Sequence, residues 1–200
     1  MNSQHTRASR SRLGQLVGGA LAAMSLSCET TLDIPPRHPD ISLHAGTGYW
    51  SARVTPRGLH GPVTSAEFYG NELRGDINRL PVSVMVDDDQ MTAQGLLAGQ
   101  PVHIHVTPEL ERLHVNGMFG GSFSEYDIGA RWIAGRVGSC GYQLVATGEA
   151  VRDGVRFDDF EGMRGCGAGV VPTELEIPDS LARFSPTRFA VLLSLLLGTR

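Results

Sequence analysis

Lysine is absent from this chain, and positive charge is scarce. All seventeen basic residues are arginine, which we attribute to codon usage rather than to function. Arg7, Arg10 and Arg12 precede the first acidic residue, and without them fourteen basic residues stand against twenty-one acidic ones, a net charge of −7. A protein that binds a nucleic-acid backbone needs clustered positive charge. The composition therefore argues against nucleic acid as a partner.

Long hydrophobic runs and familiar catalytic motifs are also missing. The apolar run at residues 189–197 holds nine residues, whereas a helix needs about 20 to cross a bilayer. Cys140 lies in "GSCGY", but no histidine follows it in the chain to act as the partner of a cysteine nucleophile. The "DDD" run at 87–89 lacks the spaced carboxylates of a calcium loop and is typical of a solvated turn. We therefore nominate no catalytic residue and favour a role other than catalysis.

The first 27 residues have the layout of an export signal. Three arginines without acidic residues are followed by an apolar stretch from Leu13 to Leu26, as in a secretory signal peptide. The next residues, "SLSC" at 25–28, resemble the lipobox of bacterial lipoproteins, with leucine two residues before the cysteine instead of the usual three. The resemblance implies cleavage before Cys28, lipidation of its thiol and attachment to a membrane of the cell envelope. Ordinary cleavage near Ser27, giving a secreted or periplasmic soluble protein, is the alternative.

The three cysteines agree with this interpretation. An odd number in an exported protein leaves one thiol to explain. Lipidation of Cys28 would account for it and leave Cys140 and Cys166 to form a disulfide, which an oxidising compartment permits. Residues 28–47 contain three prolines and no periodicity, so we expect them to form a tether between the lipid and the folded domain.

A repeat occupies the middle of the chain. Each of four units has a glycine, an apolar residue two positions later and an alternating triplet after a short gap. The triplets are apolar except for Ser124, and the glycines are Gly75, Gly95, Gly117 and Gly135. Alternation predicts strands with one buried face, so each unit is expected to form two strands joined by a turn. A degenerate copy, "FEGMRGCG" at 160–167, matches "IAGRVGSCG" at 133–141 and places Cys140 and Cys166 at nearly equivalent turns.

The repeated glycines predict a strongly curved sheet. Glycine weakens a strand, so its recurrence on the buried face indicates either a sharp bend or close packing against the backbone. We expect residues 48–178 to form an antiparallel β-meander or small barrel of roughly ten strands. A parallel β-solenoid with coils of about 20 residues is the competing architecture.

Residues 179–200 are predicted to end in a helix. Ser185 suits the N-cap, Pro186 the first helical position and Gly198 the end of the helix. Because the run from Phe189 to Leu197 is apolar except for Ser194, we expect this helix to plug or cap the open end of the sheet. Docking to a partner or to a membrane is the alternative.

Three histidines form a candidate metal site. His103, His105 and His114 lie on two neighbouring predicted strands, and burial of both apolar stripes restricts how these strands pair. The two plausible registers pair His114 with either His105 or His103. All three side chains then share the face opposite the apolar stripe, where they could bind Zn²⁺ together with a water molecule. The competing interpretation is a solvated face without a cofactor.

Together these features predict an exported, lipid-anchored protein of the bacterial cell envelope that acts as a binding or structural module. Its expected partners are the membrane, through the lipid, and another envelope protein or an apolar ligand. One alternative is a carrier that holds a lipid or other apolar molecule inside the curved sheet, although the small glycine positions argue against a roomy interior. The other alternative is a zinc protein or metal-dependent enzyme that uses the three histidines.

Overall fold

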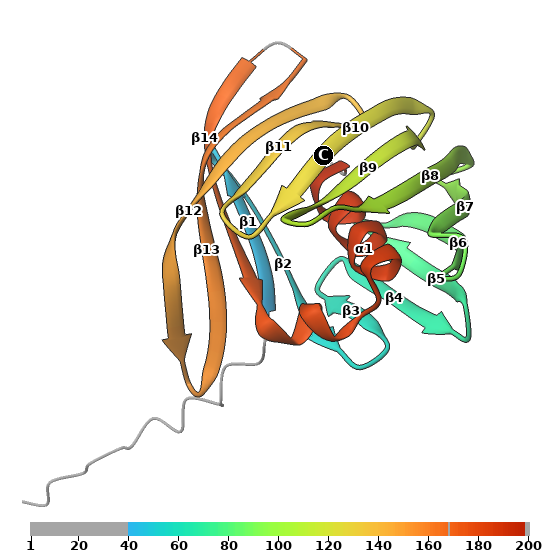
Figure 1. The fold of residues 1–200 in the computed structure, drawn as a ribbon, viewed down its shortest axis with the longest axis horizontal. Helices are drawn as coiled ribbons and strands as arrows, with labels where there is room; N and C mark the ends of the chain where they lie inside the picture. Colours follow the sequence, from blue (N-terminus) through green and yellow to red (C-terminus); the bar gives the residue numbers. More distant parts are fainter. Residues whose placement is uncertain (1–39, 168, 199–200) are drawn as a thin grey trace, which may run out of the picture. The chain divides into compact units, whose positions relative to one another are not determined.

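A computed structural model describes residues 40–167 and 169–198, which form a β-barrel with one helix inside it (Figure 1). The strands are β1 (Asp40–Ala45), β2 (Gly48–Thr55), β3 (Gly58–Gly61), β4 (Thr64–Tyr69), β5 (Glu72–Ile77), β6 (Leu80–Asp87), β7 (Thr92–Leu97), β8 (Gln100–Pro108), β9 (Arg112–Phe119), β10 (Ser122–Gly129), β11 (Trp132–Val137), β12 (Cys140–Arg152), β13 (Val155–Cys166) and β14 (Gly169–Pro178). A 3-10 helix, η1 (Asp179–Arg183), and an α-helix, α1 (Pro186–Gly198), follow.

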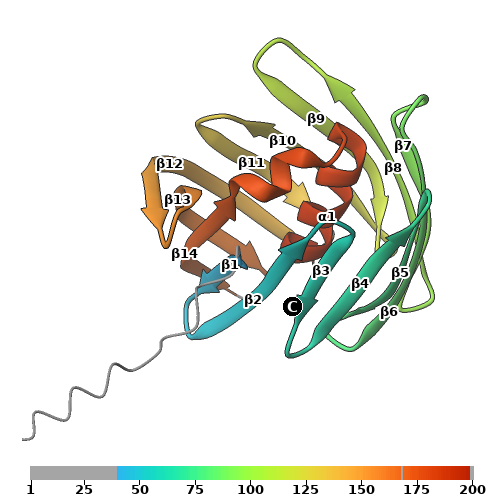
Figure 2. The same ribbon diagram turned by 90° about the horizontal axis from the view of Figure 1, so that it is seen from below.

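The barrel is a closed antiparallel meander. Each strand pairs with its neighbours in the chain, and β1 pairs with β14 to close the ring (Figure 2). The predicted antiparallel β-architecture is thereby confirmed. The solenoid alternative is wrong, because a solenoid would stack its strands in parallel.

The structure has more strands than the sequence predicted. β1 begins at Asp40, inside the segment 28–47 that was expected to be a tether. Ile41 and Leu43 alternate with polar residues and are buried, but the strand is short and its partner β14 lies at the far end of the chain. Such a distant pairing leaves no local signal in the sequence. The predicted signal peptide, Cys28 and residues 29–39 of the expected tether lie outside the described residues.

Tight turns join the strands at one end of the barrel. Residues 78–79, 98–99, 120–121 and 138–139 each form a two-residue connection between paired strands. Turns of this length favour positive φ. Asn78 and Arg79 have φ values of 51° and 64°, and Gly120 and Gly121 have values of 58° and 76°. These turns fix the register in which each repeat folds onto the next.

The repeated glycines lie where one strand passes close to the backbone of its neighbour. A Cβ atom on Gly75 would stand 1.9 Å from the carbonyl oxygen of Ser65, and one on Gly117 would stand 2.1 Å from that of His103. Their φ values of 137° and 136° also belong to a region that favours glycine. The expected close packing against the backbone is therefore present, and the packing partner is the sheet itself.

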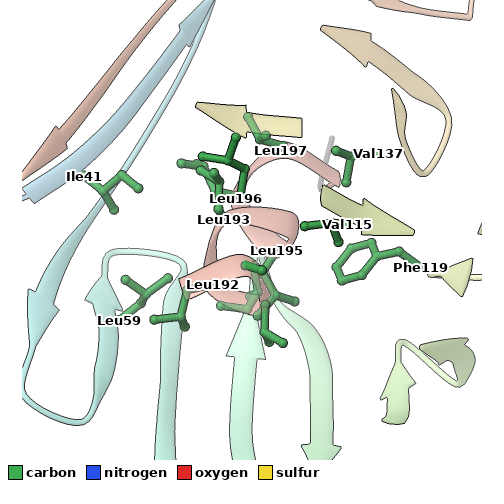
Figure 3. Packing of buried hydrophobic residues seen from close by; sticks show 14 of the residues in the cluster. Ile41, Leu59, Val115, Phe119, Val137, Leu192, Leu193, Leu195, Leu196 and Leu197 are labelled. Carbon is green, nitrogen blue, oxygen red and sulfur yellow. The ribbon is translucent and has the colours of Figure 1, made fainter. Parts of the chain in front are cut away.

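Helix α1 fills the interior that the strands enclose (Figures 1 and 2). All residues from Ala190 to Leu197 are buried, as expected for a helix that is apolar on every side. Figure 3 shows its leucines between two sets of strand residues, Ile41 and Leu59 on one side and Val115, Phe119 and Val137 on the other. A barrel of this many strands is wider than its own side chains can fill, so the helix supplies the missing core. Among the described residues, no helix has the length and apolarity needed to cross a membrane.

The start of α1 is fixed by polar contacts with the barrel. Ser185 caps the helix as predicted, since its Oγ accepts a hydrogen bond from the backbone N–H of Arg188 at 3.3 Å. The carboxylate of Asp88 accepts hydrogen bonds from the Ser185 hydroxyl and from Arg188 Nε, the latter at 3.1 Å. Asp88 belongs to the "DDD" run, so this acidic turn holds the helix in addition to facing solvent.

Candidate functional site

Cys140 and Cys166 form a disulfide, as the sequence predicted. They are directly paired across β12 and β13, with their Cα atoms 4.3 Å apart. The pairing follows from the repeat, because each cysteine lies at the same rim of the barrel in successive copies. We name this rim the disulfide end, and the opposite rim, where η1 lies, the η1 end.

The three candidate zinc ligands do not form a cluster. All three lie on the outer face, as the parity argument predicted, but β8 and β9 pair in a different register. His105 lies opposite Asn116, and His114 lies opposite Thr107, so both registers considered from the sequence are wrong. The turn is displaced toward β9 because Glu109 closes it with Arg112: the Glu109 N–H donates to the Arg112 carbonyl at 2.8 Å, and the two side chains form an ion pair at 2.7 Å.

Two of the three histidines, His105 and His114, have separate local partners. His114 Nδ1 is 2.8 Å from Asp127 Oδ1, and His105 Nδ1 is 3.3 Å from Thr107 Oγ1. Across residues 40–167 and 169–198, no group of three or more histidine, cysteine, aspartate or glutamate side chains could hold a metal ion. The structure therefore does not bring His103, His105 and His114 together as ligands.

A cavity of about 190 Å³ opens at the disulfide end. Its walls are formed by residues of β1, β2 and β13, by residues in turns between strands and by the last turn of α1. The lining residues are Leu43, Ala45, Gly48, Tyr49, Trp50, Val63, Asn78, Arg164 and Leu196. Most of this wall is apolar, and Trp50 and Arg164 supply hydrogen-bond donors.

Strand register directs Trp50 and Arg164 into the barrel. Trp50 is paired with Leu43, and Arg164 is paired with Tyr142. Leu43 and Tyr142 are both buried, and directly paired residues share a face of the sheet. Trp50 and Arg164 therefore project toward the interior from strands far apart in the sequence, and barrel closure through β1 and β14 brings them to one cavity.

The Arg164 guanidinium contacts two side chains of β12. Its central carbon lies 5.6 Å from the centroid of the Tyr142 ring, and its Nη2 lies 3.4 Å from Cys140 Sγ. A guanidinium stacked on an aromatic ring gains a cation–π attraction and loses part of its rotational freedom. The disulfide and the tyrosine thus fix a positive charge at the wall of the cavity.

Tyr142 also links this site to the helix. Burial raises the pKa of its phenol to about 12, so the hydroxyl keeps its proton at ordinary pH. That hydroxyl donates to the carbonyl of Leu197, one of the helix carbonyls that lack a partner within the helix. The ring that supports Arg164 is therefore anchored to the end of α1.

The indole N–H of Trp50 is buried, and no protein atom in the described part of the chain accepts a hydrogen bond from it. Buried donors in native proteins nearly always have a partner, because leaving one unsatisfied costs about 1–3 kcal/mol. Here the unsatisfied donor belongs to a residue that lines an open cavity. The indole N–H itself is buried in the wall and does not face the cavity.

The η1 end has a different chemistry. A cavity of about 230 Å³ there is lined by Phe160, Ile177 and Phe189 together with two carboxylates, those of Asp158 and Asp179. Burial raises the pKa of Asp158, and the nearby charges of Asp179 and Glu149 raise it further. The wall of this cavity therefore contains two carboxylates, of which Asp179 forms an ion pair with Arg156 at 3.8 Å.

Sequence reasoning did not nominate Trp50 or Arg164. For Arg164 a signal existed: in the degenerate copy it follows Gly162 by two positions, where the other units have Ile77, Leu97, Phe119 and Val137. An arginine at an inward position of a repeat is a sign of function or of a buried polar contact. For Trp50 no such signal existed, because its neighbour in space depends on closure of the barrel.

Comparison of the chain with protein-family models, with curated proteins and with solved structures finds no match. The candidate site therefore rests on its own geometry.

Proposed function

We propose that this protein is an exported, lipid-anchored binding protein of the bacterial cell envelope, and that its binding site is the cavity at the disulfide end. The observation that carries the proposal is the cavity itself, which has a volume of about 190 Å³ and a mostly apolar wall that includes Trp50. Apolar wall residues would contribute by the burial of hydrocarbon.

The cavity favours a binding protein over a carrier that encloses its cargo in the barrel. Helix α1 occupies the interior, and its residues from Ala190 to Leu197 are packed against the strands. A cargo inside the barrel would have to displace this helix. Between the described residues, the cavity at the disulfide end opens to solvent without displacement of the helix.

Cavity occupation is tested with the purified chain and a panel of benzene-sized compounds that carry acidic, neutral or basic head groups. Binding to the native state raises the melting temperature, and the stabilisation grows with the logarithm of the ratio of ligand concentration to dissociation constant. We expect at least one of these compounds to raise the melting temperature of the wild-type chain. The control is Val63→Phe, which replaces a small side chain of the cavity wall by an aromatic ring. This variant is expected to lose the stabilisation, because the ring fills part of the cavity. If no compound stabilises the wild type, this proposed function is wrong.

The lipid anchor is supported by the sequence alone, through the signal segment, Cys28 and the even pair of cysteines that remains. We expect cells fed radioactive palmitate to label the wild-type chain, and we expect Cys28→Ser to remove the label. The double variant Cys140→Ser, Cys166→Ser is the matched control. It should keep the label, since the two cysteines that it removes are bonded to each other in the wild-type chain. A wild-type chain that takes up no palmitate would contradict lipid anchoring and favour a soluble exported protein.

A further inference from the structure

We infer that the cavity at the η1 end is a second binding site, and that its ligand is a small primary amine whose hydrocarbon part is about the size of a benzene ring. The inference goes beyond the site proposed at the disulfide end, because the two cavities share no lining residue. It follows from the position of Asp158, from the charges around it and from the apolar wall that surrounds its carboxylate.

The fold places the Asp158 carboxylate inside an apolar wall. Asp158 lies on β13 directly opposite Ile177, which is buried, and directly paired residues share a face of the sheet. Phe160, two positions further along β13, projects to the same side and is also buried. The register of β13 and β14 therefore directs the Asp158 side chain to the cavity, whose wall includes all three residues.

This carboxylate has no counter-charge of its own. Burial raises its pKa, and no hydrogen bond from a described residue opposes this effect. The charge of Arg156 lowers the pKa, but its guanidinium is shared between Asp179 and Glu149, at 3.8 Å from each. A half-buried charge without a partner costs free energy, and a bound cation would remove that cost.

The other charges at the cavity favour a cation over an anion. Asp179 lines the same cavity, and the charges of Asp179 and Glu149 both raise the pKa of Asp158. Among the described residues that line the cavity, none is an arginine or a histidine. A cation that enters at the η1 end therefore meets a negative wall, while an anion would be repelled there.

The chemistry of the wall favours an ammonium group in particular. An ammonium has a compact charge and three N–H donors, and its bonds to a carboxylate are about twice as strong as those between neutral groups. A metal ion does not suit this wall, since the described part of the chain has no group of three or more histidine, cysteine, aspartate or glutamate side chains that could hold one. The ligand is therefore expected to be an organic cation.

The size of the cavity limits the rest of the ligand. A dry cavity of about 150 Å³ holds benzene. The volume here is about 230 Å³, which leaves room for one ring and a short arm that ends in an amino group. Leu113, Phe160 and Phe189 offer the hydrocarbon surface against which the ring would pack. A long alkyl chain would extend beyond the cavity.

The test compares three compounds of one shape at pH 7: benzylamine, benzyl alcohol and benzoate. Dissociation constants are measured by calorimetry on the wild-type chain and on Val63→Phe, in which a ring fills part of the cavity at the disulfide end. We expect Val63→Phe to bind benzylamine as tightly as the wild type does, at least tenfold more tightly than it binds benzyl alcohol, and to bind benzoate least. Methylamine, added as a competitor, should displace benzylamine only at much higher concentration, because it leaves the hydrocarbon contacts unused.

Variants of the cavity at the η1 end assign the contacts. Asp158→Asn keeps the shape of the side chain but removes its charge, so it should weaken benzylamine binding by tenfold or more and leave benzyl alcohol binding almost unchanged. Asp76→Asn makes the same change on the exposed outer face of β5 and should change neither. Ala182→Phe places a ring in the cavity wall and should weaken the binding of both compounds.

The outcomes separate this inference from the proposed function. If benzyl alcohol or benzoate binds Val63→Phe as tightly as benzylamine does, the amine inference is wrong. If Val63→Phe loses benzylamine binding, the compound occupies the cavity at the disulfide end, which supports the proposed function and overturns this inference. If Asp158→Asn binds benzylamine as tightly as the wild type does, the amine does not bind at Asp158 and the inference is wrong. That last comparison does not use Val63→Phe, so it holds even if this variant fails to fold.

Discussion

Asp158 faces the barrel interior at the η1 end, in a pairing position opposite the buried Ile177. Burial and the charges of Asp179 and Glu149 raise its pKa above 3.8, with Asp159 acting in the same direction and Arg156 opposing them. The unfolded chain therefore releases this proton at lower pH than the folded chain, so native stability falls as pH rises from about 3.8 through the folded pKa. We predict that Asp158→Asn raises the melting temperature at pH 7, and that the gain disappears below pH 4.

The control for this prediction is Asp76→Asn, which makes the same chemical change on the exposed outer face of β5. For this control, melting curves recorded by circular dichroism from pH 3 to pH 8 should coincide with those of the wild type. A loss of stability in Asp158→Asn at pH 7 would mean that the ionised carboxylate makes a favourable contact at the η1 end, contrary to the electrostatic argument.

At the scale of the strand, the repeated glycines are the positions that the barrel tolerates least. A Cβ atom on Gly117 would stand 2.1 Å from a backbone carbonyl oxygen, and its φ of 136° strains any other residue. Backbone cannot move aside without shifting a whole strand. We predict that Gly117→Ala lowers the free energy of unfolding by about 2–3 kcal/mol, measured by urea denaturation.

Gly148→Ala provides the comparison, since nothing lies within 4 Å of a Cβ atom at Gly148, which lies in the same kind of sheet. Its effect should stay within about 0.5 kcal/mol, as for most surface substitutions. Equal losses of stability for the two changes would show that the cost does not arise from the close approach of strands, because the effect of alanine on the unfolded chain alone is stabilising.

Strand patterns also show which features a sequence can predict. Alternation around the repeated glycines predicted the hairpins from β5 to β12 and the inward face of each, because side-chain parity is a local property. The turn between β8 and β9 was misplaced, because the Glu109–Arg112 ion pair that fixes it leaves the alternation unchanged. Strand β1 and the cavity residue Trp50 escaped notice, because both depend on closure with β14, more than a hundred residues away.

At the scale of the whole molecule, the barrel and its helix depend on each other. Five leucines of α1, at positions 192, 193, 195, 196 and 197, are buried in the barrel. Burial of each contributes about 1.5–3 kcal/mol, so together they match the net stability of an ordinary domain, about 5–15 kcal/mol. We predict that a chain ending at Phe184 loses cooperative thermal unfolding and binds a dye specific for exposed apolar surface.

A further measurement makes this prediction decisive. A peptide of residues 185–200 added to the shortened chain should restore cooperative unfolding. A shortened chain that unfolds cooperatively without the peptide would show that fourteen strands form a stable barrel around an interior emptied of α1. The barrel would then not need the helix for its stability. A carrier function, in which an apolar molecule occupies the interior in place of the helix, would then explain binding better than the cavity at the disulfide end.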